Sequence, residues 1–178
     1  NRSGSPGTSP ADYPRRPARY ARGLAPNTCR KRALKVDRSP KPASKALADA
    51  VEVLRGWDGQ MDKDSAAPLI AEHLYLQLRR KLGERASPKK GDAYATQMAT
   101  VAIERLLRAR PKDWFADYDQ LILDSLSAAI EEGAKLQGSN VKGWKWGAYN
   151  QLTIPNPVLS QIPMVGKYFN IGPAWMSG

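Results

Sequence analysis

The chain has 178 residues, of which 42% are hydrophobic and 25% charged, a composition typical of a globular protein with one core. No run approaches the roughly 20 consecutive apolar residues of a membrane-spanning helix, so we expect no membrane partner. The net charge of +11 suggests a polyanionic partner, but residues 1–42 hold 11 basic and 2 acidic residues, which leaves the remainder, with 17 against 15, at only +2.

Residues 1–42 form a basic segment with seven of the 14 prolines and no apolar periodicity. We predict a disordered arm. Its basic side chains, interleaved with Tyr13 and Tyr20, would also suit a nucleic-acid-binding arm that neutralises phosphates and stacks bases. The simpler alternatives are a linker or a mistranslated segment. The basic residues concerned are Arg15, Arg16, Arg19, Arg22, Arg30, Lys31, Arg32 and Lys35.

Ordered structure is predicted from residue 43, beginning with a helix that Ser44 caps and that ends near Gly56. Its buried face comprises Leu47, Ala50, Val51 and Leu54. A second helix is predicted with Ser65 as its cap, Pro68 in its first turn and Gly83 as its end. Its apolar face repeats every four residues, at Ile70, Leu74, Leu78 and Leu82.

A third helix is predicted to start after Asp92 and to end before Pro111, with an outward-facing ion pair between Glu104 and Arg108. Its inward residues are expected to be Met98, Val101, Ala102 and Leu106. Asp117 or Asp119 is the expected cap of a fourth helix. Its predicted buried face comprises Ile122, Leu126, Ala129, Ile130 and Leu136, with Gly138 as its end.

Residues 138–178 combine aromatic residues with glycines and four prolines, a pattern that disfavours a helix or a central strand. We expect extended chain that lies on a partner surface. The core that covers its aromatic side chains is expected to lie outside this chain. Those side chains are Trp144, Trp146, Tyr149, Tyr168, Phe169 and Trp175. The predicted fold class is therefore mainly α, with about four helices over 43–137 and an extended segment over 138–178.

Three aspartates, Asp58, Asp62 and Asp64, are close enough in sequence to suggest a calcium loop. Their order argues otherwise, because Gly59 precedes two of them and no glutamate follows at the distance an EF-hand requires. We interpret Asp58 as a turn residue and Asp64 as a neighbour of a helix cap.

The other candidate groups have structural interpretations. His73, the single histidine, lies near the apolar stripe of the second helix without a recognisable serine or cysteine partner. Lys89 and Lys90 fit a solvated loop. Cys29, the single cysteine, excludes an internal disulfide and cannot alone form a zinc site, and its segment offers no scaffold to hold a base against the thiol. None of these residues indicates an enzyme mechanism.

Three parts of the sequence stand out by their order and spacing. They are VLRGWDG at 53–59 with DSAA at 64–67, GWKWG at 143–147 with LTIPNP at 152–157, and IGPAWMSG at 171–178. Together they resemble the penicillin acylase family of N-terminal-nucleophile hydrolases, over roughly residues 45–178. The sequence departs from the family before residue 45, which leads to the hypothesis of a reading-frame error upstream.

The resemblance implies a parent enzyme with an αββα sandwich, which transfers an acyl group from a linear or cyclic amide to water. In the family, a serine freed by autoproteolysis is the nucleophile, its own amino group is the base, and an asparagine and backbone N–H groups hold the oxyanion. Ser44, Ser65 and Asn156 do not match these residues. We therefore assign no catalytic, cofactor-binding or metal residue in this chain, and calcium in the parent enzyme is implied by resemblance only.

The chain is thus expected to be an internal fragment of the large chain, inactive by itself. Its expected partners are the remainder of the enzyme, with the upstream nucleophile segment and the small chain, and the acylated amine substrate. Penicillin, as in antibiotic biosynthesis, another amide and an acyl-homoserine lactone all remain open as substrates. A periplasmic or secreted location follows from the resemblance alone.

Two other classes of function remain open. The first is a small helical module whose basic arm binds nucleic acid, although we do not expect nucleic acid as a partner. The second is a helical interaction protein without chemistry, which predicts a cooperative fold in isolation, whereas a fragment with exposed aromatic surface predicts aggregation.

Overall fold

The computed structural model describes residues 25–36, 44–91, 93, 95 and 100–178, and it is mainly helical, as predicted. None of the helices in these ranges is long and apolar enough to cross a membrane. The helices are α1 (Ala25–Val36), α2 (Lys45–Gly56), α3 (Ala67–Ala86), α5 (Thr100–Ala109), α6 (Tyr118–Gln137) and the short α7 (Trp146–Tyr149). The strands are β1 (Gln151–Ile154) and β2 (Ile171–Trp175), and 3₁₀ turns occupy Val141–Gly143, Leu159–Gln161 and Gly166–Phe169.

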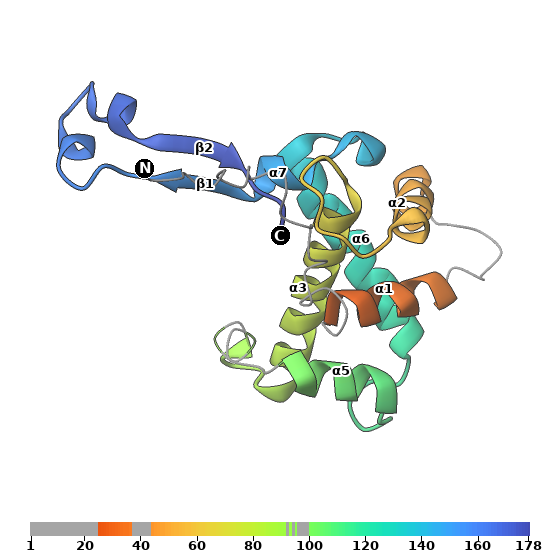
Figure 1. Ribbon diagram of the computed structural model, residues 1–178. Coiled ribbons are helices and arrows are strands. Elements are labelled where there is room, and N and C mark those ends of the chain that lie inside the picture. The colour runs from red at the N-terminus through yellow and green to blue at the C-terminus, as the bar shows by residue number, and fades with distance from the viewer. Residues whose placement is uncertain (1–24, 37–43, 92, 94, 96–99) are drawn as a thin grey trace, which may run out of the picture.

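The long helices α3 and α6 pack along each other at the centre of a helical body (Figure 1). The helix α1 crosses both of them, and α2 and α5 pack on opposite sides of α1. The largest fully buried side chains at their centre are Leu54, Leu69, Ile70, Leu74, Leu78, Leu82, Ile103, Leu107, Ile122 and Leu126. This core belongs to the described chain alone, so the helical body has its own apolar interior.

The N-termini of α2 and α6 are capped by the side chains of the residues that precede them. The hydroxyl of Ser44 accepts a hydrogen bond from the backbone N–H of Leu47 at 3.2 Å, which confirms the predicted cap. Of the two aspartates considered for α6, Asp117 is the cap, because its carboxylate accepts from the N–H groups of Asp119 and Gln120 at 2.8 and 3.0 Å. The predicted buried face of α2 is also confirmed.

The prediction that Gly83 ends the second helix is wrong, because α3 continues to Ala86. A Cβ atom at position 83 would lie 2.6 Å from the carbonyl oxygen of Gly91 and 2.7 Å from Cβ of Ala95. The glycine therefore allows the following segment to approach the helix closely. At the other end, α3 begins at Ala67, and Ser65 precedes the capping position while its hydroxyl accepts from the Ala67 N–H at 3.3 Å.

The predicted inward face of α5 is wrong for Val101 and Ala102, whereas Leu106 is partly buried and packs against the core as expected. Val101 is 58% exposed and Ala102 is exposed, whereas Ile103 and Leu107 are buried. Relative to the predicted orientation, α5 is rotated about its axis, so that these two larger side chains, one turn apart, point into the core. Met98 lies outside the described residues.

Two further predictions concern the outer surfaces of α5 and α6. The ion pair between Glu104 and Arg108 is present, with 2.5 Å between the guanidinium nitrogen and the carboxylate oxygen. Leu136, predicted to be buried in α6, is 55% exposed in the last turn of that helix. The buried face of α6 is otherwise as predicted.

The expectation of a disordered arm over residues 1–42 is wrong for residues 25–36, which form α1. Cys29 and Ala33 are buried in the core. The guanidinium of Arg30 donates to the carbonyl oxygens of Leu54 and Arg55 at 2.8 and 3.3 Å, at the end of α2. The remainder of the predicted arm lies outside the described residues. The helix was not predicted because Cys29 and Ala33, its fully buried residues among those described, are small and do not form an apolar stripe in the sequence.

After α6 the chain forms an antiparallel hairpin that projects away from the helical body (Figure 1). Strands β1 and β2 pair with Gln151 opposite Trp175, Leu152 opposite Ala174 and Ile154 opposite Ile171, with an irregularity between the last two pairs. Every residue of both strands is exposed.

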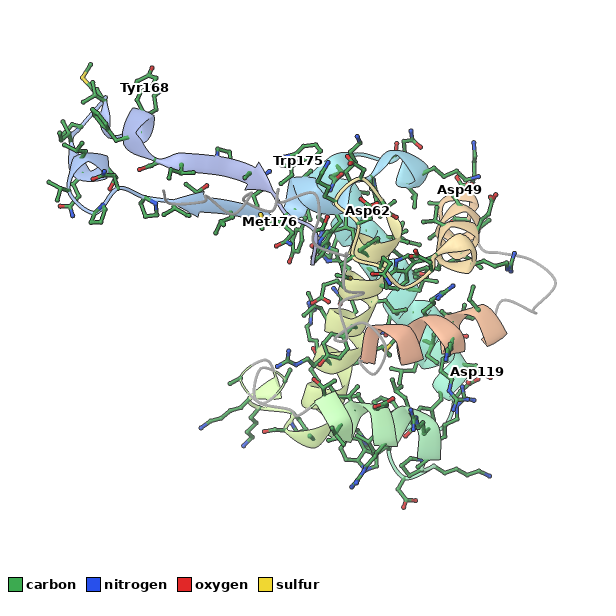
Figure 2. The ribbon with its side chains drawn as sticks, viewed as in Figure 1. Asp49, Asp62, Asp119, Tyr168, Trp175 and Met176 are labelled. Atoms are coloured by element: carbon green, nitrogen blue, oxygen red, sulfur yellow. The ribbon has the colours of Figure 1, made fainter. Side chains whose placement is uncertain are left out.

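The expectation that the covering core lies outside this chain is wrong for two tryptophans. Trp144 and Trp146 are 2% and 7% exposed within this chain, because the segment after α6 folds back onto the helical body. Trp175 and the aromatic residues of the hairpin remain partly or largely exposed. Tyr168 lies at the far end of the hairpin and points into solvent (Figure 2).

Candidate functional site

Three polar residues were compared above with the catalytic residues of the family: Ser44, Ser65 and Asn156. In this structure their side chains accept hydrogen bonds from backbone N–H groups. The hydroxyl groups of Ser44 and Ser65 accept hydrogen bonds from N–H groups at the starts of α2 and α3. The side-chain oxygen of Asn156 accepts from the N–H groups of Val158 and Leu159 at 3.1 and 2.8 Å, which closes a turn. These three residues lie in separate parts of the fold and do not form a common site.

The three sequence segments that resemble one family meet at the base of the hairpin. We call this region the junction and define it by residues 57–65, 144–147 and 175–178. The N–H groups of Trp146 and Gly147 donate to the carbonyl oxygens of Ser65 and Lys63 at 2.9 and 2.8 Å, and the N–H of Gly178 donates to the carbonyl oxygen of Met61 at 3.0 Å. One loop between α2 and α3 therefore binds both ends of the hairpin.

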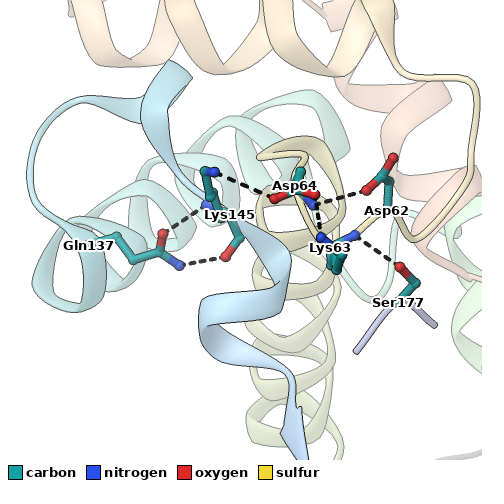
Figure 3. A network of polar contacts seen from close by, with 6 residues as sticks. All are labelled: Asp62, Lys63, Asp64, Gln137, Lys145 and Ser177. Carbon is teal, nitrogen blue, oxygen red and sulfur yellow. Dashed lines mark hydrogen bonds and ion pairs between the residues drawn. The ribbon is translucent and has the colours of Figure 1, made fainter. Parts of the chain in front are cut away.

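Charged side chains add a second layer of contacts at the junction (Figure 3). The ammonium group of Lys63 lies 2.6 Å from the carboxylate of Asp64, and that of Lys145 lies 3.5 Å from the same carboxylate. The Lys63 hydrogen bond is the main reason why the pKa of Asp64 is lowered from its usual value. Because these groups are about half exposed, each pair contributes little stability on its own.

The backbone and ring contacts of Lys145 set its position. The side chain of Gln137, at the end of α6, accepts from the Lys145 N–H at 2.8 Å and donates to the Lys145 carbonyl oxygen at 2.9 Å. The Lys145 ammonium group also lies 5.8 Å from the centre of the Trp175 ring. Lys145 thus links α6, the loop after α2 and the end of β2.

Gly147, the second residue of α7, allows this close packing. A Cβ atom at Gly147 would lie 2.9 Å from Cβ of Lys63 and 2.9 Å from Cβ of Trp175. Any larger residue would push the loop and the hairpin apart. The glycine at position 147 of the GWKWG segment is therefore required because three chain segments meet there.

An open cavity of about 1000 Å³ adjoins the junction. Its walls include Trp57, Met61, Lys63 and Ser177. The aspartates beside it act in turns: the carboxylate of Asp58 accepts from the Gln60 N–H, and that of Asp62 from the Asp64 N–H, both at 2.9 Å. This confirms the interpretation of Asp58 as a turn residue. In the part of the chain that the structure describes, no group of three His, Cys, Asp or Glu residues is arranged to hold a metal ion.

The remaining candidates are buried or solvated. Cys29 is fully buried, and burial raises the pKa of its thiol to about 12, which opposes a nucleophilic role. His73 is also buried, and its surroundings lower the pKa of the imidazole, because burial disfavours the charged form. Lys89 and Lys90 are exposed in the turn after α3, as predicted. Among these four residues, none is a nucleophile in contact with a base. The contacts at the junction hold chain segments in position.

Sequence reasoning missed Lys63, Gln137 and Lys145 as the residues that join the segments. Their contacts link positions far apart in sequence, so no local pattern reveals them. The one available signal was the pair of glycines in GWKWG, because Gly147 is required by the close approach of two other segments.

Comparison with protein families gives a match over most of the chain. A family model described as Penicillin amidase matches residues 16–178. The match begins well before residue 45, where the motifs placed the start of the resemblance, and it includes α1. This speaks against a reading-frame error over residues 16–42. A search of curated proteins found no match to the chain.

Proposed function

We propose, from the premise that this chain belongs to the penicillin amidase family, that it is a non-catalytic part of an amidohydrolase that transfers an acyl group from an amide to water. The observation that carries this proposal is the junction, where the three segments typical of the family form one packed unit. A shared structural unit explains why these segments occur together without a nucleophile among them.

The catalytic residues are expected from other parts of the enzyme. In this proposal an upstream serine, freed as the first residue of the large chain, attacks the amide carbonyl while its amino group acts as the base. The serines of the described segments that were compared with it are occupied in helix starts, which supports a positioning role for this chain. The chain alone is therefore expected to be inactive.

The hairpin is proposed to be the surface that meets the remainder of the enzyme, in a parent fold of the αββα type. A two-stranded ribbon is at best marginally stable in water and gains stability when other strands or helices cover it. Many apolar side chains of this hairpin are exposed: Leu152, Ile154, Val158, Ile162, Met164, Val165, Tyr168, Phe169 and Ile171. Lys167 is the one charged residue between positions 151 and 178, which is typical of the centre of an interface.

The substrate is proposed only as a class. An acylated amine suits the family, and penicillin, another amide and an acyl-homoserine lactone remain alternatives. The small chain and the upstream nucleophile segment are the proposed partners, with calcium and a periplasmic or secreted location as further proposals from the family. Arg30, considered above for nucleic-acid binding, instead donates to carbonyl oxygens of α2, which weakens the case for that alternative.

The test is an activity comparison between two proteins. One is encoded by the entire reading frame that contains this segment, and the other is the 178-residue chain. Both are incubated with a panel of N-acylated amines, and the release of free amine is measured. We expect release by the first protein and none by the second. Release by the chain alone would contradict its non-catalytic role, and the absence of release by both would contradict the amidohydrolase proposal.

A further inference from the structure

His73 lies where the helical body meets the base of the hairpin. It belongs to α3, is 8% exposed, and its ring centre lies 5.2 Å from that of Tyr149 in α7, with 58° between the ring planes. Because α7 leads directly into β1, Tyr149 belongs to the base of the hairpin (Figure 1). We propose that His73 is an acid-sensitive contact, which holds α7 against the body when its imidazole is neutral and releases α7 when the imidazole binds a proton.

The site suits the neutral imidazole. The Nε2 atom of His73 is buried and has no hydrogen-bond partner among the described residues. Protonation makes both ring nitrogens donors and gives the ring a positive charge, which is costly where no acceptor receives it. Burial is accordingly the largest effect on the pKa of His73, and it lowers that pKa.

The charged groups near His73 do not reverse this effect. From α6, the carboxylate of Glu132 favours the protonated ring, but it is partly exposed and already binds the ammonium group of Lys135 at 2.8 Å. From α7, Tyr149 brings its aromatic ring against His73, and the centre of the Trp146 ring lies 5.6 Å from that of Tyr149. On α3 itself the neighbouring charged residues are Glu72, whose own pKa is raised by burial, and Arg80, whose charge acts on Glu132.

The direction of the pH effect follows from linkage. The pKa of His73 with α7 docked is lower than the ordinary value of 6.5, so the docked state binds fewer protons than the open state. Docking is therefore favoured above pH 6.5 and weakens as the pH falls below it. The equilibrium constant for opening rises by about tenfold per pH unit until the lowered pKa is reached. Tyr149, 43% exposed, can move towards water as the ring becomes charged.

The test is amide hydrogen exchange of the 178-residue chain between pH 8 and pH 5, corrected for the intrinsic pH dependence of exchange. The reporter is the N–H of Gly147, which donates to the Lys63 carbonyl oxygen at 2.8 Å, and the reference is the N–H of Leu126 within α6. We expect the protection of Gly147 to fall as the pH drops below 6.5, by no more than about tenfold per pH unit, and that of Leu126 to remain. In His73→Gln, which has no titrating ring, the protection of Gly147 stays constant.

Constant protection of Gly147 in the natural chain, or the same loss in His73→Gln, would overturn the proposal. If the variant fails to fold, proton NMR of the natural chain still tests the proposal. It contains one histidine, so its imidazole signals in proton NMR spectra need no assignment by mutation. The imidazole and Tyr149 ring signals are expected to shift together, with a midpoint below 6.5. A midpoint at or above 6.5, or an unchanged Tyr149 ring, contradicts the proposal.

Discussion

The six-membered ring of Trp144 lies directly against Gly133 in α6, so that a Cβ atom at position 133 would be 2.5 Å from Cζ3 of the ring. The indole N–H of Trp144 also donates to the carbonyl oxygen of Gly138 at 2.7 Å. These contacts fold the segment after α6 back onto the helical body. They hold in place the chain that continues into the junction and the hairpin.

Replacement of Gly133 by alanine is expected to lower the free energy of unfolding by about 1–3 kcal/mol, because the added methyl group displaces the Trp144 ring. Urea unfolding monitored by circular dichroism measures the change. Gly56→Ala is the matched control, since a Cβ atom there meets no atom within 4 Å, and its expected effect is within about 1 kcal/mol. Equal losses in the two variants would show that Trp144 does not rely on the gap at Gly133.

Replacement of Arg30 by methionine tests whether α1 belongs to the fold. The variant loses hydrogen bonds to two carbonyl oxygens at the end of α2 and the contact with the Trp57 ring, whose centre lies 5.6 Å from the guanidinium carbon. We expect a loss of about 1–3 kcal/mol in the free energy of unfolding. Lys31→Met, on the exposed side of α1, is the control and should change it by less than about 0.5 kcal/mol. No difference between the two variants would mean that α1 does not pack as described.

Cys29 is expected to resist thiol reagents in the folded protein. Its thiol is fully buried and its pKa is about 12, so at pH 8 roughly one molecule in ten thousand carries a thiolate. Labelling with a disulfide reagent should be negligible in buffer and reach one equivalent in urea. Rapid labelling in buffer would show that α1 leaves the core readily.

The same burial predicts a pH dependence at alkaline pH. The unfolded thiol loses its proton near pH 9.0, whereas the folded thiol keeps it up to about pH 12, so above pH 9 the folded state binds more protons. The free energy of unfolding, measured relative to that of Cys29→Ala, should therefore fall by about 1.4 kcal/mol per pH unit above pH 9. A difference between the two proteins that stays constant from pH 8 to pH 10.5 would contradict the burial of the thiol.

Local features of the fold were predictable from the sequence, and long-range ones were not. Ser44 was predicted as a cap, and Asp117 as one of two candidate caps, because capping depends on a few neighbouring residues. Gly83 was misinterpreted as a helix end, because its role depends on Gly91 and Ala95, which approach it from the next segment. The rotation of α5 likewise depends on which side of the helix meets the body.

The junction shows the same limit for the candidate site. The segments that form it were recognised by their order and spacing, but their meeting was not predicted. Lys63 and Ser177 are 114 positions apart, and Lys145 and Asp64 are 81 apart. Contacts over such distances leave no periodic or local signal. The exposed aromatic residues at the end of the chain were recognised, whereas the burial of Trp144 depended on a gap in α6.

The hairpin allows the most direct test of the proposal, namely that its exposed apolar side chains are covered by the remainder of an amidohydrolase. The measurement is the rate of amide hydrolysis by the protein from the entire reading frame, with Met164 and Tyr168 both replaced by lysine. These side chains are 91% and 75% exposed, so the double variant should not alter the stability of the 178-residue chain. The control is Val101→Lys on the exposed face of α5. We predict a loss of at least about tenfold for the hairpin variant, since a buried charge costs more than 1.4 kcal/mol, and no loss for the control. Equal rates for the two variants would contradict the claim.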